Sequence, residues 1–340
     1  MVSFCKPIIP DMNLVNKYLD SSFKSGYLSN FGINYKRLVE RLHAYLKLDD
    51  DKEIVLVSSG HTALQASYAI ANTKKPLIPD YTFASTLVAS FEKPVIVDCD
   101  MDGFLITDVE EYYDSLVVVC PLSRIPDLQY YTEICKNKNI PLIIDGASCF
   151  GTPEIYNYGD FFCLSFHATK TFPMGEGGAV ICSKENAQKI RQYINFGMNE
   201  KKEIIMHGTN AKISEYSCAI GLALLDEIEK ENGVISARLK NAKIYQKELE
   251  EYAKKSYSGL ETVYQTFPIY VPSVEKAQNM RNRLKENNIE FIQYYKPLTK
   301  KYNAKYLYDT NISLPCHQDV SEKDIYTIIN IIKDENKNGR

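Results

Sequence analysis

The sequence predicts an α/β protein, with a large domain on a mostly parallel sheet and a smaller C-terminal α+β domain. Three features support this prediction: short continuous apolar runs, helical patterns between them, and a change of pattern after about residue 208. Continuous apolar runs are typical of strands buried on both faces of a parallel sheet. Helices between such strands give the βαβ rhythm of a doubly wound sheet. The length of 340 residues suits two domains, or one large domain with an appendage.

The apolar runs define the expected strands of the large domain, and helical patterns such as Ala63–Ala71 and Leu128–Lys138 lie between them. The expected strands are Ile54–Val57, Pro76–Ile78, Pro94–Val97, Leu116–Cys120, Pro141–Ile144, Phe161–Leu164 and Ala179–Cys182. Two longer helical patterns follow, at Ile213–Glu229 and Ser236–Lys255.

In the last hundred residues, strand-like and helical patterns no longer follow the regular βαβ order of the first part of the chain. They contain a strand-like Phe267–Val271, a helical Val274–Asn287, a strand-like Glu290–Tyr294 and a closing helix from Ser321. We therefore divide the chain into a large domain of residues 1–234 and a small domain of residues 235–340. No repeat or low-complexity linker separates the two, so we expect them to pack tightly.

Composition excludes several classes of protein. The chain has 40 basic and 43 acidic residues and a net charge of −3, so nothing indicates a nucleic-acid surface. No apolar run approaches the roughly 20 residues of a membrane span, and the N-terminus does not resemble a signal peptide. The nine cysteines form no CxxC pair, and the five histidines show no ligand spacing. We expect a cytoplasmic protein with reduced cysteines and no metal site.

The first segment with chemical potential is Val57–Leu64, where an apolar strand ends in small residues and a helix begins at once. The backbone N–H groups at that helix start, around Gly60, His61 and Thr62, form a site suited to a phosphate. An ordinary turn capped by Ser and Thr is the alternative.

The second segment is Pro141–Ala147, in which Asp145 follows four apolar residues. A carboxylate at the carboxyl end of a parallel strand lies where α/β sheets bind their ligands. It can pair with the pyridinium nitrogen of pyridoxal phosphate (PLP) and keep the ring able to accept electrons. The alternative is a turn formed by Asp145-Gly146.

The third segment runs from Leu164 to Lys170 and is followed by the glycine-rich Gly175–Gly178. Lys170 comes after a strand and before a tight turn, a position suited to Schiff-base formation if burial lowers its pKa. A simply solvated lysine is the alternative.

The order of these segments resembles that of fold-type I PLP enzymes, and in particular the DegT/DnrJ/EryC1/StrS family of sugar aminotransferases. Further stretches similar to the family span nearly the whole chain. They are Ser25–Gly32, Ile78–Ala84, Val97–Asp100, Asn210–Glu215 and Leu314-Pro315.

The resemblance implies a role for each matching residue. Lys170 matches the Schiff-base lysine, and Asp145 matches the carboxylate that faces the pyridine nitrogen. Phe83 matches the aromatic that stacks on the PLP ring. The phosphate would be held by the backbone after Gly60, at His61 and Thr62, and by the Ser165 hydroxyl. Asn210 matches an asparagine that reaches the phosphate from the neighbouring subunit, which implies a homodimer with shared active sites.

Three departures from the family pattern stand out. Ser148 occupies a cofactor-binding position where relatives have Gln or His near the phenolate oxygen of PLP. The segment Cys120–Arg124 lacks the usual His and Gly, and Tyr294–Leu298 lacks a His that often follows Pro-Leu. The last two departures concern the substrate side.

The resemblance thus implies a PLP-dependent transfer of an amino group, from an amino-acid donor such as L-glutamate, to a nucleotide-linked keto-sugar. A cyclitol or another small ketone is an alternative substrate. A PLP-binding regulatory protein without catalysis is an alternative from another class. A sugar dehydratase is disfavoured, because the resemblance associates that activity with His at the position of Lys170.

Overall fold

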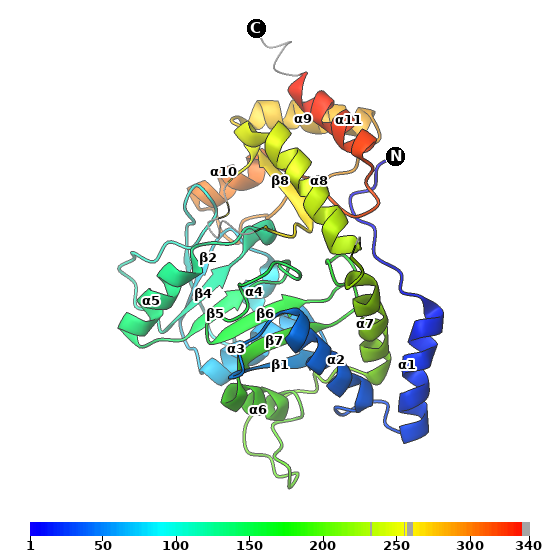
Figure 1. Ribbon diagram of the computed structural model, residues 1–340. Coiled ribbons are helices and arrows are strands. Elements are labelled where there is room, and N and C mark those ends of the chain that lie inside the picture. The colour runs from blue at the N-terminus through cyan, green and yellow to red at the C-terminus, as the bar shows by residue number, and fades with distance from the viewer. Residues whose placement is uncertain (232, 255, 257–260, 335–340) are drawn as a thin grey trace.

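Seven strands form one sheet through the larger part of the molecule (Figure 1). The computed structural model describes residues 1–231, 233–254, 256 and 261–334. The sheet order is β1-β7-β6-β5-β4-β2-β3. The strands are β1 (Lys52–Val57), β2 (Pro76–Pro79), β3 (Val95–Val97), β4 (Ser115–Val119), β5 (Leu142–Asp145), β6 (Phe161–Ser165) and β7 (Gly178–Ser183).

Six of these strands share one direction, and β7 runs against its neighbours β1 and β6. All seven strands expected from the sequence are present, with ends that differ by one or two residues. The prediction of a mostly parallel sheet is therefore confirmed.

Both faces of the sheet are buried, which explains why the strands are continuously apolar. Alternate residues of β1 enter different cores: Ile54 and Leu56 join one, Val55 and Val57 the other. The first core includes side chains from α2 (Ile33–Tyr45), α5 (Leu128–Lys138) and α7 (Glu215–Ile228). The second includes side chains from α3 (Gly60–Ala71) and α6 (Lys184–Tyr193).

Outside the first core, α1 (Met12–Ser25) packs against α2 and α7. The buried Glu215 joins these three helices. Its carboxylate accepts from the backbone N–H groups of Asn34 and Tyr35, at 2.7 and 3.1 Å, and from the Ser22 hydroxyl at 3.0 Å. Two orphan amides at the start of α2 are satisfied in this way.

The smaller part is built on two antiparallel strands, β8 (Thr266–Tyr270) and β9 (Asn311–Pro315). Side chains of α8 (Val234–Glu248), α9 (Val274–Glu286) and α11 (Glu322–Lys333) form a separate hydrophobic core with it. Helix α10 (Tyr302–Thr310) contacts α9 and also packs on residues of the larger part, among them Tyr81 and Cys99. The short elements are α4 (Ala84–Val88), η1 (Pro121–Ser123) and η2 (Glu250–Tyr252).

The prediction of a strand at Glu290–Tyr294 is wrong. This segment makes one isolated bridge, between Ile292 and Ser313, and the partner of β8 is β9. Strand β9 lies directly after α10, and neither was predicted. The expected helix Ser236–Lys255 corresponds to α8 and η2, and Lys255 lies outside the described residues. The predicted closing helix from Ser321 is present as α11, and Ser321 is its N-cap.

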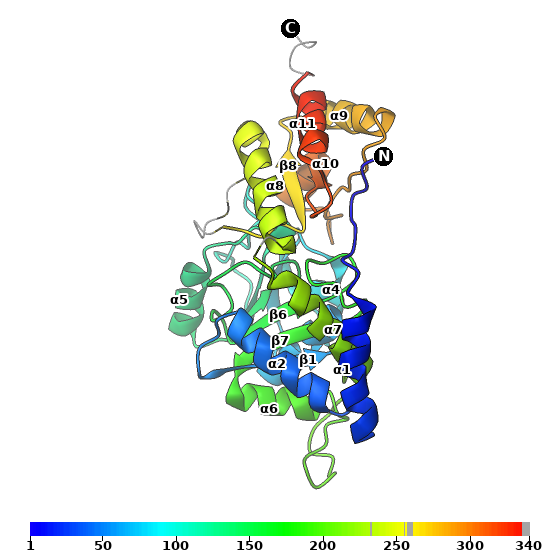
Figure 2. The ribbon, with the colours of Figure 1, turned by 45° about the vertical axis from the view of Figure 1, so that its right-hand side comes forward.

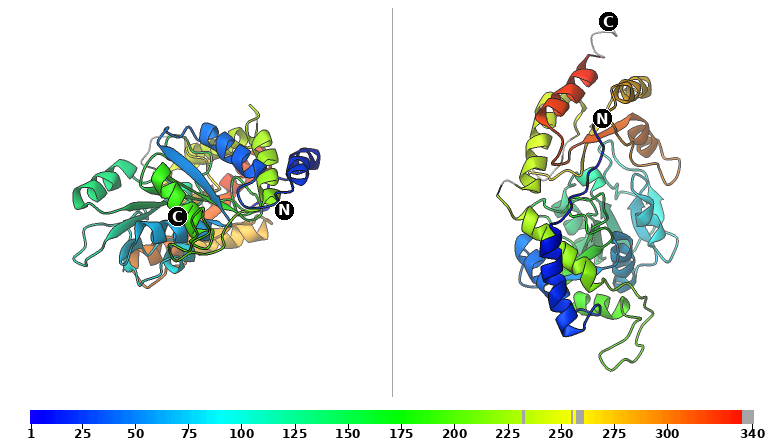
Figure 3. Two further views of the ribbon diagram at one scale, coloured as in Figure 1. Left: turned by 90° about the horizontal axis from the view of Figure 1, so that it is seen from below. Right: turned by 90° about the vertical axis from the view of Figure 1, so that its right-hand side faces the viewer.

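The N-terminal segment runs beside the smaller part before it reaches α1 (Figures 2 and 3). Val2 pairs with Ile289, and the Phe4 N–H donates to the Glu290 carboxylate at 2.9 Å. The domain division between residues 234 and 235 stays a prediction. In the structure this boundary lies at the start of α8, which begins at Val234. Within the described ranges, the helices are too short or too polar to cross a bilayer.

Candidate active site

A cavity of about 410 Å³ lies between the larger and smaller parts of the molecule. Its walls include the ends of β5 and β6, the start of α3 and the start of β8. Seven of the nine site residues predicted from the sequence line it: Gly60, His61, Phe83, Asp145, Ser148, Ser165 and Lys170. Thr62 and Asn210 are not among its lining residues.

The start of α3 forms one wall of the cavity. Ser59 caps the helix: its hydroxyl accepts from the Thr62 N–H at 3.2 Å, while the Thr62 hydroxyl accepts from the Ser59 N–H at 3.0 Å. This capping box occupies the Thr62 amide. The amides of Gly60 and His61 have no partner four residues back within the helix, and they remain available to an anion.

Gly60 permits a close approach that a side chain would block. A Cβ at this position would lie 2.6 Å from Cβ and 2.9 Å from Oγ of Ser165. A Cβ on Gly178, in the adjoining strand β7, would lie 2.6 Å from the carbonyl carbon of Ser59. The two glycines therefore let the helix start, the Ser165 hydroxyl and the end of β7 meet at one point.

Asp145 ends β5 and is buried, with 6% of its surface exposed. Its Oδ2 accepts from the Thr86 hydroxyl at 2.7 Å, and its Oδ1 accepts from the Ala147 N–H at 3.3 Å. Burial raises the pKa of the Asp145 carboxyl, while the Thr86 and Ala147 hydrogen bonds and the nearby Lys170 charge oppose that rise.

Lys170 follows β6 and reaches the cavity from the loop after it. Its Nζ donates to the side-chain oxygen of Gln265 at 3.1 Å. Burial lowers the pKa of the Lys170 amine, and the charge of Asp145 acts in the opposite direction. The amine thus lies in a setting that favours its neutral, nucleophilic form.

Two other predicted residues complete the walls. Phe83 caps α4 and keeps 62% of its surface exposed, so a flat apolar face is available to a ligand. The Ser148 hydroxyl accepts from the Ser123 N–H at 3.0 Å, and the Ser148 carbonyl accepts from the Ser123 hydroxyl at 2.8 Å. Ser148 thereby fixes the neighbouring loop as well as lining the cavity.

Asn210 lies away from the cavity of its own chain. Its side chain is exposed, and its Oδ1 accepts from Lys212 Nζ at 2.8 Å. The backbone of Asn210 pairs with Asn195, at the base of a loop that ends before α7.

Two residues that sequence reasoning missed contact the ionisable pair. Thr86 lies in α4, three residues after Phe83, and this closeness to a predicted site residue could have indicated that Thr86 lies near the site. Gln265 comes from the smaller part, 95 residues after Lys170, and no local pattern marks it. Contacts between distant segments of this kind are visible only in the fold.

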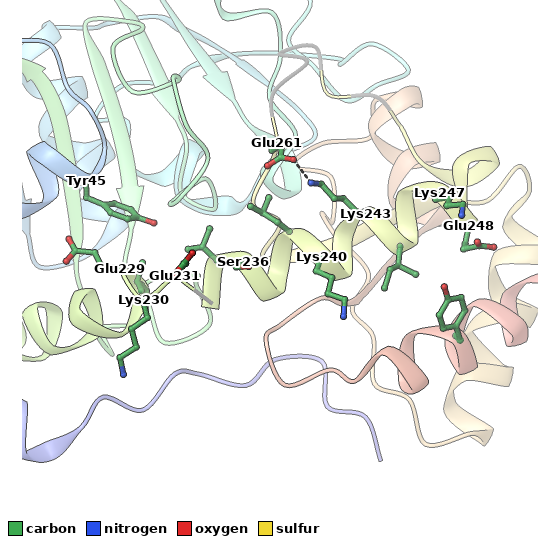
Figure 4. A pocket seen from close by; sticks show the side chains of 15 residues that line it. Tyr45, Glu229, Lys230, Glu231, Ser236, Lys240, Lys243, Lys247, Glu248 and Glu261 are labelled. Carbon is green, nitrogen blue, oxygen red and sulfur yellow. Dashed lines mark ion pairs between the residues drawn. The ribbon is translucent and has the colours of Figure 1, made fainter. Parts of the chain in front are cut away.

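A larger hollow of about 950 Å³ runs along α8, and none of the residues that line it also lines the cavity of Lys170 and Asp145 (Figure 4). Lysines and glutamates line it, including the ion pair between Lys243 and Glu261. Such an open, mixed-charge surface is typical of a solvated helix face. The part of the chain that the structure describes has no group of three or more His, Cys, Asp or Glu arranged to hold a metal ion.

Comparisons with known proteins match the chain over nearly its whole length. A model of the DegT/DnrJ/EryC1/StrS aminotransferase family matches residues 11–333. The dTDP-4-amino-4,6-dideoxy-D-glucose transaminase of Shigella dysenteriae is 27% identical over 363 residues, which cover 97% of each chain.

Solved structures show the same fold. A Bacillus cereus protein described as a PLP-dependent aminotransferase matches with a TM-score of 0.86 at 22% identity, covering 98% of this chain and 99% of the other. DesI, solved in the presence of its TDP-sugar product, matches with a TM-score of 0.85 at 24% identity, covering 100% and 94%.

The buried Asp145 carboxyl predicts a pH-dependent stability difference. Because its folded-state pKa lies above the unfolded value, its stabilising contribution is present at low pH and is lost as the pH rises through the folded-state pKa. Asn at position 145 does not ionise. We expect ligand-free Asp145→Asn protein to resist urea better than wild type at pH 7, with the gap closing toward about pH 4.

The matched control is Asp108→Asn, which removes the same charge from an exposed position. It should leave the urea midpoint nearly unchanged at both pH values. An Asp145→Asn protein that is less stable than wild type at pH 7 would show that the carboxylate is stabilised where it lies.

Proposed function

This chain belongs to the DegT/DnrJ/EryC1/StrS aminotransferase family, and on that premise we propose that it transfers an amino group to a keto-sugar carried on a nucleotide. The chain is a PLP-dependent aminotransferase. The observation that carries the proposal is that Lys170, Asp145 and the start of α3 all line one cavity.

The substrate class rests on the relatives. The Shigella dysenteriae protein is a transaminase of a dTDP-linked amino sugar, and it matches this chain over 97% of both lengths. DesI has a TDP-sugar as its product. An amino-acid donor, L-glutamate by the family resemblance, completes the reaction.

The residues of the cavity fit PLP. Gly60 leaves a cradle for the phosphate at the helix start, because an added Cβ at this position would clash with Ser165. The exposed Phe83 face suits the ring. The buried Asp145 carboxylate suits a pyridinium, because a buried charge needs an opposite one. When bound, PLP supplies an electron sink that stabilises the negative charge left on the donor's α-carbon after its proton departs.

The chain's own groups then have distinct tasks. Lys170 Nζ would take the proton from the α-carbon of the donor and deliver it to C4′ of the cofactor. Burial lowers the pKa of this amine, which favours its action as a base. Asp145 holds the ring nitrogen protonated, and Thr86 keeps the carboxylate in place through its 2.7 Å hydrogen bond. The amides of Gly60 and His61 and the Ser165 hydroxyl would bind the phosphate, whereas the Thr62 amide, predicted for the same role, donates to the Ser59 hydroxyl.

We further propose a homodimer whose active sites are shared, with Asn210 reaching the partner's phosphate. Asn210 lies outside its own cavity and is exposed, so its amide is accessible to a second subunit. The adjoining loop carries exposed apolar side chains: Phe196, Ile204 and Ile205 are 49%, 78% and 52% exposed. A cluster of this kind suits a protein interface.

The first test of the function uses the absorbance of the PLP-loaded protein. L-glutamate should convert the cofactor to its amine form, and a dTDP-, UDP- or GDP-linked keto-sugar should restore the original spectrum. Lys170→Ala should lower turnover by about a thousandfold or more, because one amine both links the cofactor and moves the proton.

The control is Lys74→Ala, which removes an exposed lysine and should leave turnover unchanged. Restoration of the spectrum by a cyclitol ketone alone would contradict the nucleotide-sugar proposal. A spectrum that glutamate never changes would favour a binding protein without catalysis.

The second test mixes subunits that carry Asn210→Ala with subunits that carry Lys170→Ala. If the sites are shared, one site of the mixed dimer carries both lesions and the other carries neither, so about half of a dimer's activity should return. Alone, Asn210→Ala should weaken PLP retention by about tenfold to a hundredfold, as expected for a lost hydrogen bond to a phosphate.

If each subunit used its own Asn210, every mixed dimer would show only the weakened Asn210→Ala activity. A protein that stays monomeric at the assay concentration would also rule out shared sites.

A further inference from the structure

We propose that Gln265 is a positioning residue for Lys170, which holds the lysine amine through an amide oxygen without supplying a counter-charge. The inference rests on the proposed function and deepens it, since it concerns how the smaller part of the molecule controls the lysine. The contact that carries it is the 3.1 Å hydrogen bond from Lys170 Nζ to Gln265 Oε1.

Gln265 is itself held firmly from two sides. Its N–H donates to the Ser123 hydroxyl at 3.2 Å, and its carbonyl accepts from the Arg238 guanidinium at 3.1 Å. Arg238 also donates to the Tyr264 carbonyl, at 3.3 Å. These contacts fix the backbone of the turn before β8, so the Gln265 side chain starts from a defined place.

Arg238 and Ser123, the two residues that hold the Gln265 backbone, are both buried, so water does not compete for their hydrogen bonds. Arg238 lies in α8 with 1% of its surface exposed. Ser123 is fully buried and makes two hydrogen bonds with Ser148, which lines the cavity. Gln265 therefore connects α8 of the smaller part with the cavity wall of the larger part. The placement of the smaller part therefore affects the placement of the Lys170 amine.

The charges around the amine show why a neutral acceptor matters. Asp145, Cys149 and Cys5 are the titratable groups that favour the charged form of Lys170, from β5, the loop after it and the N-terminal segment. Burial raises the pKa of the Cys5 thiol, so this group stays protonated at neutral pH. Two further charged or titratable residues line the cavity, His167 and Glu176, with 3.8 Å between the His167 Nε2 and Glu176 Oε1 atoms.

Asp145 is thus the carboxylate whose charge raises the pKa of the amine, and burial of the amine opposes that effect. A second carboxylate at position 265 would stabilise the ammonium form directly. The amide oxygen accepts one hydrogen bond and adds no net charge. Lys170 is therefore oriented and still able to lose its proton, as a nucleophile and a base require.

The test compares Gln265→Glu, which has nearly the same shape, with wild type. PLP is added to PLP-free protein across a range of pH, and the absorbance band of lysine-bound cofactor is followed. We expect the pH midpoint for formation of the band to rise by about one unit or more in Gln265→Glu. The pH profile of kcat should shift in the same direction.

Two further variants separate charge from position. Gln265→Asn keeps a neutral amide on a shorter side chain, so the band should form more slowly without a shift of the midpoint. Gln278→Glu adds the same charge on the exposed face of α9, and it should behave as wild type.

An unshifted midpoint in Gln265→Glu, beside a normal wild-type band, would overturn this inference alone. A Gln278→Glu shift as large as that of Gln265→Glu would also overturn it, because a general charge effect would then suffice. A wild-type protein that forms no lysine-bound band would overturn the proposed function, and this inference with it.

Discussion

Burial of the Lys170 amine and the Asp145 carboxyl in one cavity is the constraint on which the rest of the site depends. Burial moves their pKa values in opposite directions, toward the neutral form of each group. The electrostatic attraction between them opposes both changes. Neither group is stabilised fully in its charged form, so the cavity is suited to a ligand that supplies the missing charge and to a lysine that gives and takes protons.

The fold supplies this setting from a few strand ends. Asp145 ends β5, Ser165 ends β6, and the start of α3 faces both across Gly60. The smaller part then covers the cavity with the start of β8, which brings Gln265 to Lys170. One side of the site thus comes from the ends of the sheet strands, and the other comes from residues that lie about a hundred positions later in the chain.

Much of this could be predicted from the sequence, for physical reasons. The seven strands are buried on both faces, so each appears as an unbroken apolar run. Asp145 and Lys170 each follow such a run, where parallel sheets place ligands. Strand β9 was not predicted, because the short Asn311–Pro315 segment has the buried polar residues Asn311 and Ser313 where the other strands have an unbroken apolar run. Gln265 acts through a contact between elements far apart in the chain, and no local pattern encodes such a contact.

The most direct test of the central claim identifies the residue that carries the cofactor. The protein is loaded with PLP and reduced with borohydride, which makes the link between lysine and cofactor permanent, and its peptides are then mapped by mass spectrometry. The account predicts the modification on Lys170. Protein in which Lys170 is replaced should carry no stable modification on any other lysine. Modification of a different lysine, or no stable modification after PLP loading, would contradict it.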